Sequence, residues 1–394
     1  MAKQLRVGIV GTRRGQVFLG ALAGRPECQV VGLADRDPAR LAEAMRLCPQ
    51  ARGYAELDVL LAEERPDIVI VATDAPSHRD HALQSMEAGA DVLSEVPAAF
   101  TAQQHLDIVE AAARTGRRYS MAENCVHWGF IQTWQRMVAA GQLGEIAYAE
   151  AEYLHSLPDR HYVDAEGRYH THEEAAADST IHAVWRARFH PIQYLTHSLG
   201  PILWITGDRC VSVSCLATPA WRDPMCASPD LEAALFHTAA GRIIRIVCGF
   251  NVAYPAGHRF SLMGTKGTVK WDSFGESQPR MWLEGNNLTG WATVPWSTER
   301  VDGPEEARRS GHGGADWYVA QEFVAALARG DAPPLDVHRS MDMSLPGACA
   351  AISAERGGEA IPIPDTRDPA QVAAWLARGY TEPWPIGRQE RAGW

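Results

Sequence analysis

The chain has 394 residues, 46% of them hydrophobic, and a formal net charge of -11. This length favours two domains rather than one. The negative charge argues against a nucleic-acid or anionic-membrane binder, because such proteins need a basic face. No apolar run approaches the roughly 18 residues of a membrane span, and the N-terminus leads directly into a predicted strand rather than a signal peptide. We therefore expect a cytoplasmic protein.

The eight cysteines are scattered along the chain and form no CxxC pair. Without such a pair or a secretory context, we expect reduced thiols rather than disulfides or a zinc site.

Residues 5 to 125 alternate short β-branched runs with longer helical stretches, which is the pattern of βαβ units around a parallel sheet. Asp37 and Pro38 are typical of a helix start, as N-cap and first helical residue. The predicted strands are LRVGIVG, CQVVGLAD, DIVIVAT, DVLSEVP and RRYSMAEN, and the helices are VFLGALAGR, DPARLAEAMRLC, 77–88 and 102–115. The sequence therefore predicts an α/β Rossmann domain over residues 1–125.

Residues 126–394 have a different pattern, in which strands joined by glycine-bearing turns follow a short helix through Trp134 and Met137. The predicted strands are EIAYAEAEYLHS, CVSVSCLA, LEAALFHTAAGRIIRIVCGF, HRFSLMGTKGTVKWD and RMWLEG. We expect an α+β domain with a large, mainly antiparallel sheet and a loop-like insertion at 161–179. Two late helices, 315–329 and 339–356, should pack back near the Rossmann domain. One face of this sheet can contact a second copy of the chain, so we expect a homodimer or homotetramer.

The turn from Gly11 to Gly15 lies between the first predicted strand and helix, where a dinucleotide fold binds the pyrophosphate. It departs from GxGxxG because Arg13 takes the second glycine position, so a plain βα turn is the alternative. Asp35, near the end of the second strand, is placed to bind ribose hydroxyls and favours NAD over NADP, although Arg36 could offset this. The predicted cofactor contacts are Gly11, Thr12, Arg13, Arg14, Asp35, Arg36, Thr73, Pro76 and His78.

VIVATDAPSH, GADVLSEVP and the mixed C-terminal domain resemble the Gfo/Idh/MocA superfamily of nicotinamide-dependent sugar oxidoreductases. Ordinary dehydrogenases of that superfamily carry Glu-Lys-Pro in the second segment, and the lysine contacts the reacting hydroxyl. This chain has Glu95-Val96-Pro97 and no lysine between residues 4 and 265. The resemblance adds Glu95 and Pro97 to the expected cofactor contacts, but valine cannot transfer a proton.

SEVPAA, MAENC, EYLHSL and YLTHSLGPI resemble a subgroup, the NAD-dependent glycoside hydrolases that include α-N-acetylgalactosaminidases and NAD-dependent sulfoquinovosidases. This resemblance implies a cycle in which the sugar is oxidised at C3 and loses the C2 proton. The aglycone is then eliminated, water adds, and the hydride returns. No net oxidation would occur.

By motif match, the resemblance places five residues in the active site: Glu123, Tyr153, His155, Tyr194 and His197. It implies Tyr153, supported by His155, as the base for the C2 proton, and His197 as the partner of the C3 hydroxyl. Tyr194 and Glu123 would orient ring hydroxyls. Tyr153 and His155 are two apart on a strand and share a face. The alternative is a half-buried core or interface aromatic for each tyrosine and a hydrogen-bonded structural histidine for each histidine. For Glu123 it is a surface or ribose-contacting carboxylate.

Four further residues are candidates for ligand contacts. Arg186 and Arg188 lie in a basic, aromatic stretch, and guanidinium groups match carboxylate, phosphate or sulfonate oxygens. His312 opens a late helix, and Asn124 could contact the nicotinamide ribose. The segment 170–174 (HTHEE) carries metal-ligand residue types, but we interpret it as solvated loop charges and predict no metal site.

Three functions remain open at this stage. The first is an NAD-dependent glycosidase acting on a small glycoside, including an anionic one such as a sulfoquinovoside. The second is a sugar dehydrogenase or 3-keto-glycoside processing enzyme, and the third is a non-catalytic NAD-responsive sensor. The fold alone cannot choose among them.

Overall fold

A computed structural model describes residues 4–157, 160–255, 257–271, 278–380 and 384–386. Its contacts divide the chain into two units. Unit 1 comprises Met1–Thr133 and Ser297–Ser344, and unit 2 comprises Trp134–Trp296 and Leu345–Trp394. The division differs from the predicted 1–125 and 126–394, because residues 297–344 return to the first unit.

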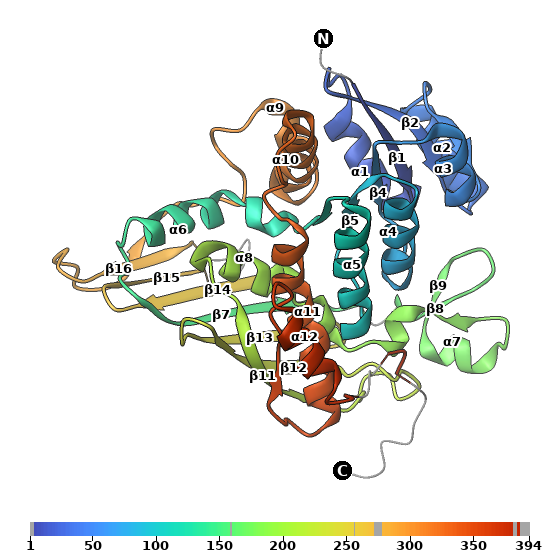
Figure 1. The fold of residues 1–394 in the computed structure, drawn as a ribbon. Helices are drawn as coiled ribbons and strands as arrows, with labels where there is room; N and C mark the ends of the chain where they lie inside the picture. Colours follow the sequence, from blue (N-terminus) through green and yellow to red (C-terminus); the bar gives the residue numbers. More distant parts are fainter. Residues whose placement is uncertain (1–3, 158–159, 256, 272–277, 381–383, 387–394) are drawn as a thin grey trace. The chain divides into compact units, whose positions relative to one another are not determined.

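The sheet of unit 1 has the strand order β3-β2-β1-β4-β5-β6, and its neighbouring strands pair in parallel (Figure 1). The order reverses between β1 and β4, which is the position where doubly wound folds bind ligands at the carboxyl ends of the strands. This confirms the predicted Rossmann domain. The strands are β1 (Leu5–Val10), β2 (Cys28–Ala34), β3 (Arg52–Tyr54), β4 (Ile68–Val71), β5 (Asp91–Ser94) and β6 (Tyr119–Met121).

Helix α2 (Pro38–Leu47) begins where the sequence supplies a cap. The side chain of Asp37 accepts hydrogen bonds from the Ala39 and Arg40 amides, and Pro38 is the first helical residue, as predicted. The helices are α1 (Thr12–Leu22), α2 (Pro38–Leu47), α3 (Leu57–Glu64), η1 (Ala75–Ser77), α4 (His78–Glu87), α5 (Ala102–Thr115), η2 (Asn124–His127) and α6 (Gly129–Ala139). The late segment adds α9 (Glu305–Arg308), η6 (His312–Gly314), α10 (Ala315–Arg329) and α11 (Val337–Glu355), which continues into unit 2.

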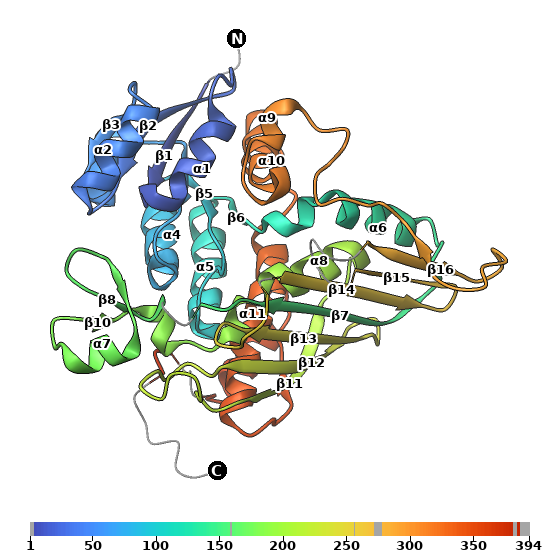
Figure 2. The ribbon, with the colours of Figure 1, turned by 180° about the vertical axis from the view of Figure 1, so that it is seen from behind.

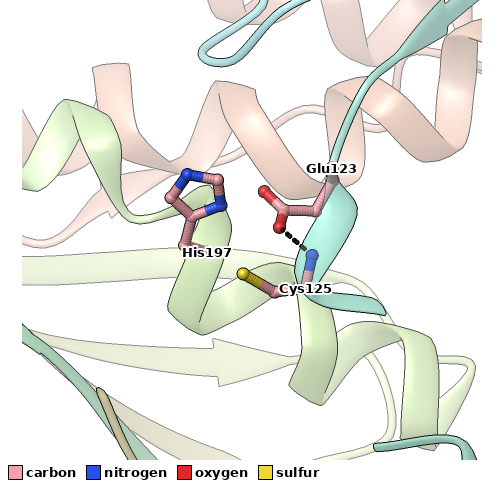
Figure 3. Close-up of side chains that lie close together, drawn as sticks. All are labelled: Glu123, Cys125 and His197. Atoms are coloured by element: carbon pink, nitrogen blue, oxygen red, sulfur yellow. Dashed lines mark hydrogen bonds between the residues drawn. The ribbon is translucent and has the colours of Figure 1, made fainter. Parts of the chain in front are cut away.

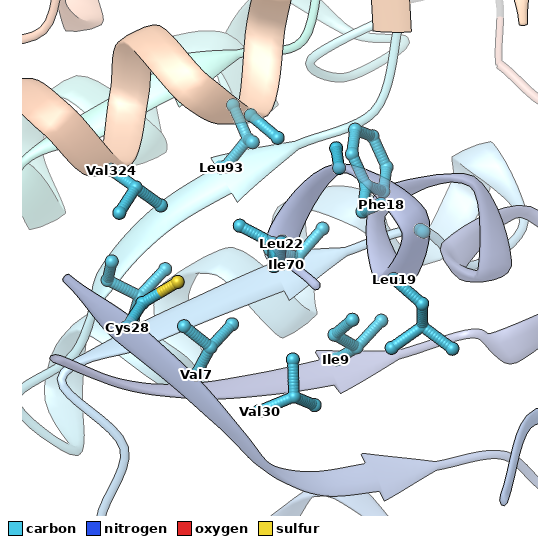
Figure 4. Close-up of a cluster of buried hydrophobic side chains, with 14 of the residues drawn as sticks. Val7, Ile9, Phe18, Leu19, Leu22, Cys28, Val30, Ile70, Leu93 and Val324 are labelled. Carbon is cyan, nitrogen blue, oxygen red and sulfur yellow. The ribbon is translucent and has the colours of Figure 1, made fainter. Parts of the chain in front are cut away.

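Helix α10 belongs to unit 1 because its apolar face completes the core of that unit. Val324 of α10 lies in one buried cluster with Phe18 and Leu22 of α1 (Figure 4). Phe323 of α10 belongs to the same cluster. Burial of one such side chain stabilises the fold by about 1.5–3 kcal/mol. Helix α10 therefore shares the buried core of unit 1.

The sheet of unit 2 runs in the order β17-β16-β15-β14-β7-β13-β12-β11-β18 over the described residues (Figure 2). It is mostly antiparallel as predicted, but β7 pairs in parallel with β13. The strands are β7 (Ile146–Leu154), β11 (Cys210–Ala217), β12 (Leu231–Thr238), β13 (Ile243–Gly249), β14 (Gly257–Gly264), β15 (Gly267–Trp271), β16 (Arg280–Leu283), β17 (Ala292–Thr293) and β18 (Ile361–Pro362).

The predicted loop at 161–179 is wrong in part, because this segment contains ordered elements. It holds β8 (Tyr162–Val163), β9 (Tyr169–His170) and α7 (His172–Ala177), and β10 (His182–Ala183) completes a small sheet in the order β10-β8-β9. Two-residue strands are too short to show alternation in a sequence. The remaining helices of unit 2 are η4 (Trp185–Arg188), η5 (Pro191–Tyr194), α8 (Thr196–Thr206) and α12 (Pro369–Leu376).

All eight cysteines are buried with free thiols, which confirms the prediction of reduced cysteines. In the part of the chain that the structure describes, no helix combines the length and apolar character that a membrane span requires.

Candidate functional site

The turn after β1 has the geometry of a dinucleotide-binding turn. Gly11 has φ 85°, and a Cβ there would lie 2.5 Å from the backbone of Ala72 and Thr73, so only glycine lets the turns after β1 and β4 approach so closely. Helix α1 starts at Thr12, directly after it. A glycine turn, a helix N-terminus and the strand-order reversal together fit the pyrophosphate of NAD.

Asp35 follows β2, at the position that holds ribose hydroxyls in such folds. Its Oδ2 accepts hydrogen bonds from the amide and hydroxyl of Thr12, at 2.7 and 2.8 Å. The neighbouring Arg36 is exposed and donates to Glu56 at 3.3 Å. Asp35 is therefore held at the pyrophosphate turn, whereas Arg36 points to a surface carboxylate.

His78, at the start of α4, links two of the predicted cofactor segments. Its Nδ1 lies 2.8 Å from the carbonyl oxygen of Pro97, and its Nε2 lies 2.9 Å from that of Thr73. The ring is buried, as is Val96 beside Pro97. Val96 occupies the place at which the resemblance expects the catalytic lysine, so this position is filled by a buried apolar side chain.

Arg14 lies at the centre of a polar network in unit 1 that joins α1 to α10. It donates to Glu95 at 2.6 Å and to Asp316 at 2.8 Å. Asp316 also accepts from Asn124, at 2.8 Å, and lies 2.8 Å from Nδ1 of His312. Burial raises the pKa of Asp316, but the hydrogen bonds and charges of His312 and Arg14 outweigh it and hold the pKa well below its usual range.

Glu123 and Cys125 lie at the carboxyl end of β6, on the same edge of the sheet. The Oε1 of Glu123 accepts a hydrogen bond from the Cys125 amide at 3.0 Å (Figure 3). The Glu123 side chain is fully buried, so the surface-carboxylate alternative is wrong. A buried carboxylate thus lies at this edge of the sheet.

The predicted catalytic residues of unit 2 form one cluster of rings on β7 and α8. The Tyr153 ring lies 4.6 Å from that of His155, 5.3 Å from His197 and 6.2 Å from Tyr194, measured between centroids. Tyr194 ends η5, and its ring lies 5.9 Å from that of His197 at the start of α8. The sequence thus brings together four of the five predicted catalytic residues within this unit.

The environment of this cluster favours neutral histidine. Burial lowers the pKa of His155, and the nearby His197 and Arg186 lower it further. The His155 ring is therefore neutral near pH 7 and can accept a proton.

Arg186 lies against the rim of the cluster. Its guanidinium carbon stands 4.3 Å from the Trp185 ring centroid and 5.7 Å from that of Tyr194, in cation–π contact with both. Within the described ranges no carboxylate pairs with Arg186. Arg188, two residues on, is exposed. Arg186 is thus held in place by rings, with its charge available for an anion.

Two residues of these sites were missed by sequence reasoning. His258 of β14 faces Tyr153 across the strand pair, with ring centroids 4.7 Å apart. Asp316 is the acceptor that joins Arg14, Asn124 and His312. Its signal was the glycine-rich segment before α10, since a Cβ at Gly311 would lie 2.4 Å from Oδ2 of Asp316.

Comparison with known protein families gives two matches that together cover most of the chain. Residues 5–123 match the oxidoreductase family with an NAD-binding Rossmann fold, Gfo/Idh/MocA. Residues 132–371 match the C-terminal domain of glycosyl hydrolase 109.

Curated relatives are similar over almost their whole length. A glycosyl hydrolase family 109 protein of Stenotrophomonas maltophilia is 26% identical, over 95% of this chain and 91% of the relative. An alpha-N-acetylgalactosaminidase of Tannerella forsythia is 24% identical, over 92% of this chain and 86% of the relative.

Solved structures share the fold. A levoglucosan dehydrogenase in complex with NADH superposes with a TM-score of 0.76 at 16% identity, covering 92% of this chain and 100% of that one. An oxidoreductase domain protein from Kribbella flavida gives 0.73 at 20% identity, over 92% and 100%. With an NAD-binding Rossmann domain before a glycosyl hydrolase 109 C-terminal domain that spans more than half of its length, the chain belongs to glycosyl hydrolase family 109 and is an NAD-dependent glycosidase.

Proposed function

We propose that this enzyme cleaves glycosides by transient oxidation at C3 of the sugar, followed by elimination and hydration, and that its substrate is an anionic glycoside such as a sulfoquinovoside. The observation that carries the mechanism is the ring cluster of Tyr153, His155, Tyr194 and His197, combined with the buried Val96 in the lysine position. The chain thereby offers histidine and tyrosine, rather than lysine, for proton transfer.

The chemistry that NAD supplies when bound is the acceptance of a hydride from C3 and its return at the end of the cycle. His197 accepts the proton of the C3 hydroxyl. Tyr153 takes the C2 proton, which the C3 carbonyl has made acidic, and neutral His155 supports it by accepting the phenol proton. The electron pair left at C2 expels the aglycone oxygen from C1.

Water then adds to C1 and gives up one proton, which replaces the proton that the departing aglycone oxygen takes from the Tyr153–His155 pair, and this pair returns a proton to C2. Tyr194 and Glu123 orient the ring hydroxyls. His197 returns its proton to the C3 oxygen, so that with the hydride that bound NAD would restore, the sum of the steps is hydrolysis. Each residue that moves a proton in this scheme lies in unit 2.

The anionic substrate is supported by Arg186. In a chain with a formal net charge of -11, a guanidinium held between Trp185 and Tyr194 favours an anionic substituent. A neutral sugar would leave that charge without a partner.

The mechanism is tested with the purified full-length enzyme. Bound dinucleotide is released by denaturation and identified, and native enzyme is offered aryl glycosides without added cofactor. We expect bound NAD and sustained cleavage without accumulation of NADH. Steady accumulation of NADH would support a sugar dehydrogenase instead, and no reaction over a broad panel would support a sensor.

The substrate class is tested by comparing an aryl sulfoquinovoside with an aryl N-acetylgalactosaminide. Arg186→Gln should raise KM for the sulfoquinovoside and leave the neutral substrate unchanged. Arg188→Gln is the matched control, because that side chain is exposed. Equal effects of Arg186→Gln on both substrates would contradict the anionic assignment.

A further inference from the structure

Three metal-ligating side chains meet in unit 2, apart from the ring cluster. His161 precedes β8, and Asp223 and Cys226 lie in the loop between β11 and β12. Their side-chain nitrogen, oxygen and sulfur atoms all lie within 4.8 Å of one another. The three residues are 2%, 2% and 5% exposed, so this is a buried polar group and not a surface cluster.

The spacing of these atoms is close to that around a tetrahedral zinc ion. Zinc binds nitrogen and oxygen at about 2.0 Å and sulfur at about 2.3 Å, which separates its ligand atoms by roughly 3.3–3.5 Å. Nδ1 of His161 lies 3.1 Å from Oδ2 of Asp223. Sγ of Cys226 lies within 4.8 Å of both atoms, so all three side chains can reach one ion after a local shift of the sulfur.

The loop holds its two ligands in place before any ion binds. The Cys226 amide donates to the Asp223 carbonyl oxygen at 2.9 Å, which closes a turn with two residues between the ligands, a spacing that zinc sites use. Oδ1 of Asp223 accepts from the Tyr162 hydroxyl at 3.2 Å and from the Met225 amide at 3.2 Å. These bonds orient Oδ2 toward His161, as the supporting shell of a metal site does.

Charge balance also favours a divalent cation here. A Zn²⁺ ion with one thiolate, one carboxylate and one neutral imidazole has no net charge, so its burial costs little. Binding breaks the S–H bond of Cys226 and releases that proton to water, and no oxidant or reductant is required.

We propose that His161, Asp223 and Cys226 bind a structural zinc ion that ties the insertion bearing β8, β9, α7 and β10 to the loop between β11 and β12. The same loop supports the segment that carries Arg186, since the amides of Ala227 and Ser228 donate to the Ala187 carbonyl oxygen at 2.9 and 3.2 Å. The ion would thus stabilise the rim of the ring cluster without contacting the substrate.

The test uses the full-length enzyme purified without chelators. Elemental analysis should find stoichiometric zinc in the native protein, and Cys226→Ser and Asp223→Asn should each lose it. Cys48→Ser, a buried thiol at the end of α2 in unit 1, is the matched control and should retain the metal. Chelation should accelerate proteolysis within residues 160–184.

Cobalt titration of the chelator-treated native protein keeps the proposal testable if a variant fails to fold. Cobalt bound to Cys226 should give a thiolate charge-transfer band in the near ultraviolet, which is absent from Cys226→Ser. A native protein with no zinc and no such band would overturn the site. Unchanged zinc content in a folded Cys226→Ser variant would overturn it too.

Discussion

The two faces of the sheet in unit 2 carry opposite chemistry on the same strands. On one face, Tyr153 of β7 and His258 of β14 are paired neighbours, and aromatic and imidazole rings surround them. On the other face, Glu152 of β7 lies opposite Arg259 of β14. Two glutamates and two arginines there form a closed set of ion pairs, of 2.6 to 3.2 Å, between Glu150, Glu152, Arg245 and Arg259.

The difference follows from the alternation of side chains along a β-strand, in which successive residues point to opposite faces of the sheet. Neighbouring residues of β7 point to opposite faces, so the ring cluster and the set of ion pairs share one strand. On the face with the ion pairs, here called the lattice face, each charge is neutralised by a partner. The opposite face, here called the ring face, carries the tyrosine and histidine rings to which the proposed mechanism assigns proton transfer.

The largest expected effect is at the ring face. Tyr153→Phe and His197→Ala should each lower turnover of an aryl glycoside by about 10²- to 10⁴-fold, because each removes a group that transfers a proton. Bound NAD, measured after denaturation, should be retained, since both residues lie in unit 2. Near-native rates in both variants would remove the assignment of these residues.

The second effect is on stability and concerns the buried pair of His190 and Glu232. His190 and Glu232 are both fully buried and joined at 2.6 Å, and Glu232 also accepts from the Ile192 amide before Tyr194. Glu232→Gln removes the buried counter-charge of His190 and leaves the imidazole only the partly exposed Glu355, at 3.1 Å, which should reduce the free energy of unfolding by about 3 kcal/mol. Urea unfolding measures this change, and a loss below about 1 kcal/mol would contradict it.

The same pair predicts a pH dependence of stability. Burial lowers the pKa of His190, but the charge and hydrogen bond of Glu232, with Glu355, outweigh it and raise the pKa to about 9. Because the folded value lies above the unfolded value of about 6.5, the stabilisation is complete below that pH and is lost as the pH rises through 9. Unfolding followed from pH 6 to 10 should show this decline in the native enzyme but not in His190→Gln.

A smaller effect is expected in the pH dependence of activity. As the pH falls, kcat/KM should decrease when His155 becomes protonated. Because the pKa of His155 is lowered, this decrease, the acidic limb of the pH profile, should lie below pH 6.5. Arg186→Gln removes a positive charge that lowers this pKa, so the limb should move to higher pH by less than about one unit. Movement to lower pH would contradict a base role for His155.

The smallest effect is expected at the lattice face. Arg259→Gln should change the free energy of unfolding by less than about 1 kcal/mol and leave turnover unchanged, because the pair is partly solvated and about a third of the arginine side chain is exposed. A large loss of turnover would show that the two faces are coupled.

Local signals in the sequence were sufficient for much of the fold. Asp37 and Pro38 set the start of α2, and the apolar periodicity of residues 315–329 matches α10 from end to end. Such elements are decided by caps and periodicity within a dozen residues. The parallel pairing of β7 with β13 is not local, since it depends on which strands meet in space.

Neighbouring site residues could be predicted where they belong to one short sequence motif. They could not be predicted where their proximity depends on how two distant strands pair. Tyr153 and His155 share a face because they are two apart on a strand, and they do lie in ring contact. His258 joins them only through the register of β14 on β7, which no spacing in the sequence reveals. Asp316 likewise becomes the partner of Arg14 only after α10 has packed on α1.

The most direct test of the mechanism is the fate of the C2 hydrogen. The enzyme is incubated with an aryl glycoside in D2O without added cofactor, and the sugar product is analysed by NMR and mass spectrometry. Removal and return of the C2 proton predicts catalytic cleavage with deuterium at C2 of the product. Catalytic cleavage that leaves the original hydrogen at C2 would contradict the oxidation and elimination mechanism.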